Sequence, residues 1–466
     1  MRNVRRKLAE FSSSLEGLYG QMVSQIRNSD DVELYKSILG IVSVVKQPIT
    51  LVDLASFINA DHDSDFYLSL PDAVDECGSF LTVRDSTIFF VHQSAQVYLI
   101  KHAGNLIFTG GCIEGQQRLM VLQSLDVLDR VLRRNVYDLP NLDCAVDLII
   151  VPDIDPLAPI LYISIYWIDH LCEAGSIHYI ELLCSNGRVD AFLSKHFLHW
   201  LEALSLTDHI LDGIIAITKL NNFFTSISID SRLPVLVYDE YRFLLSWNRI
   251  IENYPLQVYI SALIFGPVRS LTRELFHKEL DWIDVTSDIK THWRADIQTL
   301  RDHDDMVSSV ALSTNGALIA SGSDDKTIKA WDANTGTCLH TLNGHEYSVS
   351  SVAFSGDGLI ALGSKDGSIR IWDTSVANCL KTLYVHGAAV KSIAFSNHGK
   401  MLALGVDGGT LRIRDIDGDD YPKTLLSHSG PVNSVAFSDN DVLIAAGSDD
   451  KKLPFGILVR KIVTKY

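Results

Sequence analysis

The sequence of 466 residues lacks most features that mark a secreted, membrane or nucleic-acid-binding protein. Its seven cysteines are odd in number and widely spaced, and no two of them are separated by two residues. This pattern indicates reduced thiols, not a disulfide framework or a zinc site. Basic residues number 40 against 57 acidic ones, and the net charge of −17 disfavours binding to a phosphate backbone. The cysteines are Cys77, Cys112, Cys144, Cys172, Cys184, Cys338 and Cys379.

Long apolar runs are also missing. The uncharged segments 253–268 and 306–323 are interrupted by Pro, Ser, Asn or Gly, and both are shorter than the roughly 20 residues that a membrane span needs. The basic start at 2–7 is similar to a mitochondrial presequence, but Glu10 and Glu16 interrupt it, so a solvated helix start is favoured. We therefore expect no membrane contact and a cytoplasmic location.

The C-terminal part contains an internal repeat. Histidines recur at nearly constant spacing, at His303, His345, His386 and His428. Each is followed by a run that alternates apolar and polar residues, such as Val-Ser-Ser-Val-Ala-Phe, which predicts a strand. A turn and a second strand follow. In the first two copies a third strand then ends in Trp-Asp. A period of about 40 residues with several short strands is typical of a repeated β-sheet unit.

These residues resemble WD repeats, which build β-propeller blades of four strands. Four copies cover about 296–455. In that family a His, a turn Asp, a strand Ser or Thr and the Trp hydrogen-bond within each blade. The matching candidates here are His303, Asp325 and Trp331; His345, Asp366 and Trp372; His386; and His428 with Asp450. We interpret these residues as scaffold, not as catalytic bases or metal ligands, because one blade spacing separates the histidines.

The copies depart from the WD pattern toward the C-terminus. Ser321 supplies the strand hydroxyl in the first copy, whereas Arg414 replaces Trp and Gly408 replaces the turn Asp in the third. Pro454 falls inside the third strand of the fourth copy, where it would break the ladder. We therefore expect a partial propeller with an open edge, which favours self-association. The other copies have an aliphatic residue in place of the hydroxyl: Leu362, Leu404 and Ala446.

The segment 30–103 has the pattern of a winged helix. Predicted helices and two short strands alternate, and Thr50 with Asp53 forms a capping pattern. Between 47 and 103 the only basic residues are Arg84 and Lys101, against eight acidic ones, so an internal regulatory role is favoured over DNA binding. The predicted helices are 31–44, 51–59, 71–77 and one starting near 92–94; the strands are 80–83 and 87–91.

The segment 104–295 reads as helical. Leucines at 122, 125, 128 and 132 have helical spacing, and 256–264 shows the same periodicity before Gly266-Pro267. The aromatic residues of this region are interpreted as core. A second group, Asp153, Asp155, Asp169 and His170, invites an enzymatic interpretation, but solvated loop acids are the favoured account. The aromatic residues are Trp167, Phe197, Trp200 and Trp247.

Five stretches give a second resemblance, to fungal NACHT–WD-repeat receptors of the vegetative-incompatibility type. That family consists of signalling NTPases with an effector, a NACHT nucleotide switch, a winged helix, a helical connector and a WD-repeat sensor. The chain contains no Gly-x-x-x-x-Gly-Lys-Ser/Thr loop, so the resemblance implies a fragment without the nucleotide-binding core. The stretches are 18–23, 90–95, 151–171, 198–205 and 259–267.

The sequence therefore predicts a multidomain α plus β chain, with a winged-helix and helical N-terminal part followed by a partial WD-repeat propeller. We expect a non-enzymatic sensor without cofactor or metal, which binds proteins through its repeats, with Tyr347, Asp304 and Lys365 free for a ligand. Two alternatives stay open. One is a general WD-repeat scaffold or adaptor, for instance in a ubiquitin-ligase or organelle-fission assembly. The other is part of a signalling NTPase whose P-loop lies outside this chain. The expected domains are 1–29 (the tail of a NACHT-type module), 30–103 (winged helix), 104–295 (helical connector) and 296–466 (WD repeats).

Overall fold

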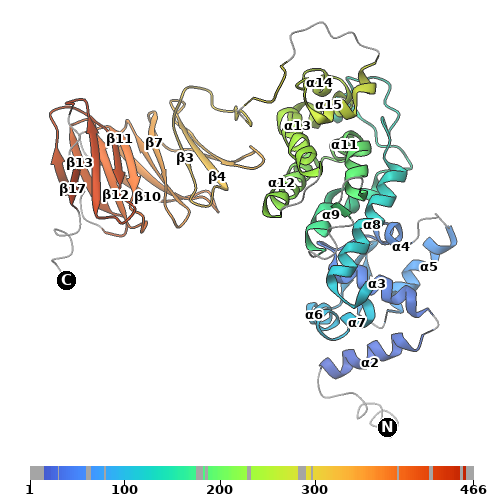
Figure 1. Ribbon diagram of the computed structural model, residues 1–466. Coiled ribbons are helices and arrows are strands. Elements are labelled where there is room, and N and C mark those ends of the chain that lie inside the picture. Colours follow the sequence, from blue (N-terminus) through green and yellow to red (C-terminus); the bar gives the residue numbers. More distant parts are fainter. Residues whose placement is uncertain are drawn as a thin grey trace. The chain divides into compact units, whose positions relative to one another are not determined.

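The computed structural model divides into two compact units, Met1–Ile297 and Gln298–Tyr466 (Figure 1). The first is helical apart from one hairpin, and the second consists of β-sheets. The structure describes residues 15–29, 31–58, 64–77, 80–174, 182–183, 187–227, 232–281, 290–294, 297–385, 388–418, 423–451 and 455–457.

The first part of the helical unit consists of short helices and one two-stranded hairpin. Thr50 forms a capping box directly before helix α4 (Leu51–Ile58), since the Asp53 carboxylate accepts the Thr50 N–H at 2.9 Å and the Thr50 hydroxyl accepts the Asp53 N–H at 3.1 Å. Asp85 and Ser86 form the hairpin turn with positive φ angles of 48° and 63°. The elements are α2 (Leu15–Arg27), α3 (Val32–Val44), α4 (Leu51–Ile58), α5 (Ser64–Asp75), β1 (Leu81–Arg84), β2 (Thr87–Phe90), α6 (Gln93–His102) and α7 (Gly104–Ile107).

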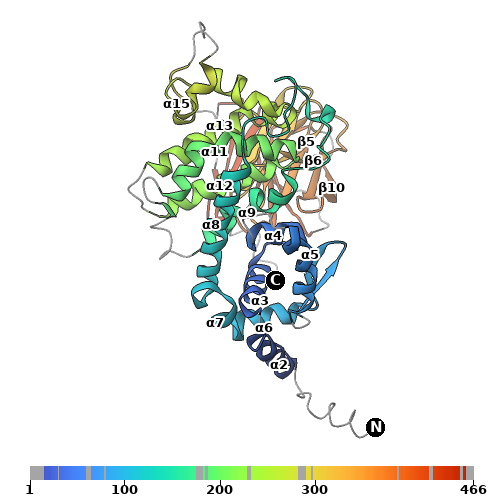
Figure 2. The same cartoon turned by 90° about the vertical axis from the view of Figure 1, so that its right-hand side faces the viewer.

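The second part of this unit is a group of longer helices, among them α9, α11, α12 and α13 (Figure 2). Trp167, Phe197 and Trp200 are fully buried there, so their interpretation as core is confirmed. The elements are η1 (Thr109–Gly111), α8 (Ile113–Val131), η2 (Val146–Leu148), η3 (Ala158–Ile160), α9 (Leu161–Glu173), α11 (Arg188–Leu206), α12 (Ile210–Ser226), α13 (Leu233–Asn253), η4 (Pro255–Tyr259), α14 (Ser261–Ile264), α15 (Leu271–Leu275) and η5 (His277–Leu280).

Two helix predictions need correction. Helix α5 starts at Ser64, earlier than predicted, so Pro71 lies inside the helix and not at its first turn. Proline removes one backbone donor, but its φ is compatible with the helix. The periodic run 256–264 is not one helix either. The backbone breaks at Ile260, with φ −121° and ψ −85°, between η4 and α14. The buried Tyr259 hydroxyl donates a hydrogen bond to the Glu202 carboxylate at 2.5 Å. The apolar periodicity of this run therefore reflects burial of its side chains and not a continuous helix.

The second unit consists of four antiparallel sheets, and Figure 1 shows them standing one behind another. The first three have four strands, each hydrogen-bonded to the next in chain order, and the last has three. We call them the first to fourth blade. The strands are β3 (Val307–Leu312), β4 (Leu318–Ser323), β5 (Ile328–Asp332) and β6 (Cys338–Leu342); β7 (Val349–Phe354), β8 (Leu359–Ser364), β9 (Ser368–Asp373) and β10 (Asn378–Tyr384); β11 (Val390–Phe395), β12 (Met401–Val406), β13 (Thr410–Asp415) and β14 (Lys423–Ser427); β15 (Val432–Phe437), β16 (Leu443–Ser448) and β17 (Phe455–Ile457).

The blades share one internal register. Each first strand carries a register shift directly after its first valine, for example between Val307 and Ser309 and between Val349 and Ser351. Directly paired residues project from the same face of a sheet. The repeat therefore places equivalent side chains on equivalent faces, and neighbouring blades meet through repeated contacts. His386 and Pro454 lie outside the described residues. The predicted roles of His386 in its blade and of Pro454 in the third strand of the fourth copy therefore stay predictions.

Candidate functional site: the blade networks and their surroundings

The first blade holds a closed polar network. His303 donates through Nδ1 to the Asp325 carboxylate at 2.8 Å, and its Nε2 lies 2.7 Å from the Ser321 hydroxyl. Trp331 Nε1 donates to the same hydroxyl at 2.8 Å. A neutral imidazole that accepts from Ser321 satisfies every one of these groups. Although burial tends to raise the pKa of Asp325, hydrogen bonds from Thr327 and His303 lower it to about 2.

The second blade holds only part of this network. Leu362 pairs with Val352 as Ser321 pairs with Val310, so an aliphatic side chain occupies the place of the hydroxyl. His345 Nδ1 lies 2.9 Å from the Ser368 hydroxyl and 3.4 Å from Asp366.

The consequence is two buried nitrogens without a partner. Among the described residues, His345 Nε2 and Trp372 Nε1 make no hydrogen bond. Burial lowers the pKa of His345, because a charged imidazole would be poorly solvated there. The hydroxyl is therefore the atom on which the complete network depends.

The third and fourth blades also lack the strand hydroxyl, with Leu404 and Ala446 at its register position. Gly408 stands at the turn, and Arg414 Nε is buried with no hydrogen-bond partner among the described residues. In the fourth blade His428 Nδ1 lies 3.0 Å from the Asp450 carboxylate, while Nε2 has no partner in the described part. Ala446 occupies the hydroxyl position there, paired with Val435.

The turn aspartates hold the backbone of the loop that enters each blade. Asp325 accepts the Asp304 N–H at 3.1 Å, and Asp366 accepts the Glu346 N–H at 3.0 Å. The fourth blade repeats this contact from Ser429 to Asp450 at 3.2 Å. The described residues contain no group of three His, Cys, Asp or Glu side chains arranged to hold a metal ion. The hydrogen bonds of the turn aspartates therefore fix the backbone of the loops that enter the blades.

The loop residues expected to be free differ from one another. Tyr347 is 60% exposed, and Asp304 is exposed as well. Lys365 is not free, since its Nζ lies 3.7 Å from the Asp324 carboxylate of the first blade. The pair joins two successive blades.

The helical acids singled out in the sequence do not form one site. Asp153 is exposed on its loop. Asp155 accepts hydrogen bonds from the Tyr137 hydroxyl and the Leu157 N–H, both at 2.8 Å, so it fixes that loop.

Asp169 and His170 also have separate partners. Asp169 forms an ion pair with Lys219. His170 is fully buried between Gln117 and Tyr162, whose hydroxyl lies 2.9 Å from Nε2. Burial lowers the pKa of His170 to about 3, so it is neutral at physiological pH. Asp169 and His170 are adjacent in sequence, but their side chains contact different residues and do not form one site.

Two buried carboxylates were not singled out in the sequence. Asp239 accepts the Ser270 hydroxyl at 2.7 Å, the Thr272 N–H at 2.8 Å and Trp293 Nε1 at 2.7 Å, and thereby ties the end of the helical unit to α13. Only an acid inside an apolar helical pattern marks such a residue in the sequence. Glu202 likewise accepts from three donors: the Asn135 N–H, the Val136 N–H and the Tyr259 hydroxyl.

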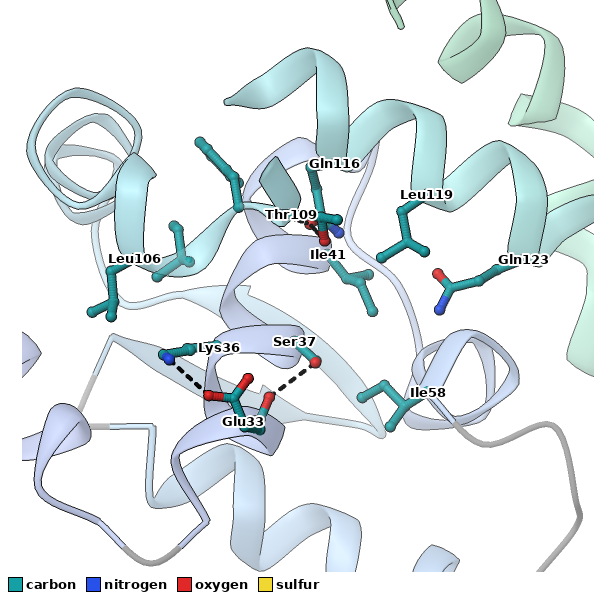
Figure 3. Close-up of a pocket in the computed structure, with 12 residues that line it drawn as sticks. Glu33, Lys36, Ser37, Ile41, Ile58, Leu106, Thr109, Gln116, Leu119 and Gln123 are labelled. Carbon is teal, nitrogen blue, oxygen red and sulfur yellow. Dashed lines mark hydrogen bonds and ion pairs between the residues drawn. The ribbon is translucent and has the colours of Figure 1, made fainter. Parts of the chain in front are cut away.

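A small pocket lies between α3, α4 and α8 in the helical unit (Figure 3). Its volume of about 210 Å³ is below the range of about 300–1,000 Å³ that is usual for small-molecule sites. Glu33 and Lys36 form an ion pair on one side, and Thr109 donates to Gln116 on another. The lining of the pocket is Glu33, Lys36, Ser37, Ile41, Ile58, Leu106, Ile107, Phe108, Thr109, Gln116, Leu119 and Gln123.

The four blades match the family model described as WD domain, G-beta repeat, at residues 294–332, 336–373, 377–415 and 420–453. The second unit therefore consists of WD repeats, as the sequence predicts. Within the described ranges, every helix is too short or too polar to cross a bilayer.

Comparison with curated proteins adds particular relatives. The chain is 42% identical over 353 residues to the vegetative incompatibility protein HET-E-1 of Podospora anserina, an alignment that covers 72% of this chain and 26% of that protein. It thus spans about a quarter of that relative's length. The nuclear distribution protein PAC1 of Arthroderma benhamiae is 47% identical over 70 residues, 13% of this chain and 15% of that protein. A probable E3 ubiquitin ligase complex SCF subunit sconB of Arthroderma otae is 46% identical over 55 residues, 12% and 8% of the two chains.

Proposed function

We propose that this chain is the non-enzymatic, protein-binding sensor region of a NACHT–WD-repeat signalling receptor of the fungal self/non-self recognition type. The observation that carries the proposal is the 42% identity to HET-E-1 over 72% of the chain, which is far more than the repeats alone occupy. Repeats that hold loops on a rigid frame are suited to protein recognition.

Each of the three regions before the repeats has a proposed role. Residues 1–29 are the tail of a NACHT-type module, 30–103 a winged helix and 104–295 the connector. Helices α3 to α6 with the β1–β2 hairpin support the winged-helix assignment. The bridge between Thr50 and Thr87, which joins the hairpin to the start of α4, supports it further. The acidic charge of this segment favours contacts within the receptor over nucleic acid.

The repeat unit is the proposed binding region, in the cytoplasm and without a cofactor. Exposed loop residues beside the polar networks, such as Tyr347 and Asp304, are proposed to contact protein partners. Association with a second copy of the chain is part of the same proposal, because WD propellers usually close and these four blades leave two outer faces.

Two alternatives retain some support. A general scaffold or adaptor role agrees with the similarity of the repeats to PAC1 and to sconB, whose names describe nuclear distribution and a ubiquitin ligase complex. A role within an NTPase agrees with the HET-E-1 match, provided that the phosphate loop lies outside this chain.

Two measurements on the purified full chain test the proposal. We expect no saturable binding of labelled ATP or GTP; micromolar binding that unlabelled nucleotide displaces would favour the NTPase alternative. We also expect Tyr347→Ala to lose proteins that the wild-type chain captures from a fungal extract, while Tyr254→Ala, a control at an exposed tyrosine of the helical unit, retains them. Equal capture by both variants would contradict binding through the repeat loops.

A further inference from the structure

Each blade has two faces, one toward the preceding blade and one toward the next, which we call the leading and the trailing face. On the leading face of the second blade, Val349 and Val352 pack against the first blade, and they are 0% and 6% exposed. The counterparts in the third and fourth blades are equally buried. In the first blade the same positions are open: Val307, Val310 and Leu312 are 47%, 66% and 66% exposed.

The trailing faces carry a glycine that makes room for these valines. A Cβ added to Gly322 would lie 2.6 Å from Val349 and 2.8 Å from Val352. Gly363 and Gly405 meet the leading residues of the third and fourth blades just as closely. Gly447 holds the equivalent place in the fourth blade, and in the described structure no atom lies within 4 Å of a Cβ built there. Among the described residues, none covers this copy of the receiving surface on the fourth blade.

The inter-blade hydrogen bonds show the same repetition. Ser309 Oγ accepts the N–H of Val352 in the next blade at 3.1 Å. The contact recurs from Ile393 to Ser351 at 3.0 Å and from Val435 to Ser392 at 3.1 Å.

The two outer faces hold the two halves of this hydrogen bond. Ser434 is the equivalent acceptor in the fourth blade, where its side chain is exposed. Val310 is the equivalent donor in the first. One outer face therefore carries the acceptor and the other the donor.

We propose that a second copy of this chain occupies these surfaces, with the leading face of its first blade stacked on the trailing face of the fourth. Since each copy has one face of each kind, two copies can form two such interfaces and close a ring of eight blades, within the range of about four to eight that propellers adopt. The inference rests on the proposed role of the repeats in protein binding. The two copies would thus meet through the faces of their outer sheets and not through the edges of their strands.

One position at the proposed interface would bring like charges together. Between the first and second blades, Asp324 pairs with Lys365. In the proposed ring Asp449 would stand opposite Asp324, so two carboxylates would meet where the first and second blades have an ion pair. The third and fourth blades already have two aspartates, Asp407 and Asp449, at this position. Asp449 is exposed and Asp324 is partly exposed, so solvent screens their repulsion and keeps it small. Asp449→Lys should remove it and strengthen the association a few-fold.

The test is sedimentation velocity of the full chain over a concentration series. We expect a species of twice the chain mass that is lost in Val310→Asp and in Ala445→Asp, which introduce a charge on the leading and trailing outer faces. Val376→Asp is the matched control, because Val376 is as exposed as Val310, at 66%, but lies in the turn before β10. Circular dichroism of each variant checks that the fold is retained.

Five outcomes separate support from contradiction. Dimerisation that is weakened by both face variants, unchanged by Val376→Asp and strengthened by Asp449→Lys supports the inference. A wild-type monomer at tens of micromolar overturns it, as does a dimer that survives both face variants. Growth beyond two copies overturns the closed ring. A monomer that nevertheless loses captured proteins on Tyr347→Ala overturns this inference and the proposed self-association, and it leaves the proposed binding of protein partners through the repeats standing.

Discussion

The first and second blades share one strand arrangement but stabilise it differently. In the first, Ser321 joins His303 and Trp331 in a hydrogen-bonded network. In the second, Leu362 stands at the same register position and packs into the apolar cluster between the blades. The leading face of the second blade is covered by its neighbour, whereas the apolar residues on the leading face of the first are exposed.

One position of the repeat can therefore stabilise a blade in two ways. A hydroxyl satisfies two nitrogens, and a leucine instead adds apolar contact while leaving those nitrogens unpaired. Burial of a Leu side chain contributes about 1.5–3 kcal/mol, enough to offset one or two lost hydrogen bonds. We therefore expect the polar residues of the blades to act as scaffold that tolerates exchange, so that variation among the repeats need not reflect different ligands.

The largest effect is expected when the tryptophan of either blade is removed. Trp331 is 2% and Trp372 8% exposed, so Trp331→Ala and Trp372→Ala should each lower the free energy of unfolding by about 3–5 kcal/mol. Thermal unfolding measures this. A melting temperature for Trp372→Ala within about one degree of wild type would show that the blade alignment is wrong.

A smaller effect is expected from the hydroxyl of the first blade. Ser321→Ala leaves His303 Nε2 and Trp331 Nε1 without a partner, as their counterparts already are in the second blade, at a cost of about 1–3 kcal/mol. Ser375→Ala is the control, since Ser375 is exposed and bonds only to Asp373 of its own turn, and should change stability by less than about 0.5 kcal/mol. Equal effects of the two substitutions in denaturant unfolding would contradict a role for the network.

The smallest effect separates the two blades most finely. Trp331→Phe removes a donor that Ser321 accepts, whereas Trp372→Phe removes an N–H that has no partner in the described structure. Both variants lose similar apolar area. Trp331→Phe should therefore be more destabilising by about 1 kcal/mol. The difference between the two unfolding free energies measures this, and a larger loss for Trp372→Phe would reverse our interpretation.

Much of the repeat unit was predictable from the sequence, because strands of period two and a constant spacing fix each blade locally. The Thr50–Asp53 capping box was predictable for the same reason. The partners of Asp239 and Glu202 were not, since they are distant in sequence and depend on how the helices pack. The break at Ile260 was hidden by a periodicity that burial alone maintains.

The outer faces of the first and fourth blades were only partly predictable from the sequence. Gly322 and Gly447 occupy the same repeat position, and no sequence pattern distinguishes the covered glycine from the open one. Only the packing of neighbouring blades reveals that difference.

The most direct test of the central claim, that the outer faces are built for the same contact as the inner ones, is disulfide formation between two copies. A chain with Gly447→Cys is mixed with a differently tagged chain with Val307→Cys, under mild oxidation. Gly322→Cys with Val349→Cys in one chain marks the corresponding internal contact, since a Cβ at Gly322 would lie 3.2 Å from the Val349 Cβ. We predict a mixed-tag, reducible dimer that forms only when both cysteines are present. Efficient closure of the internal pair without any mixed-tag dimer would contradict the account.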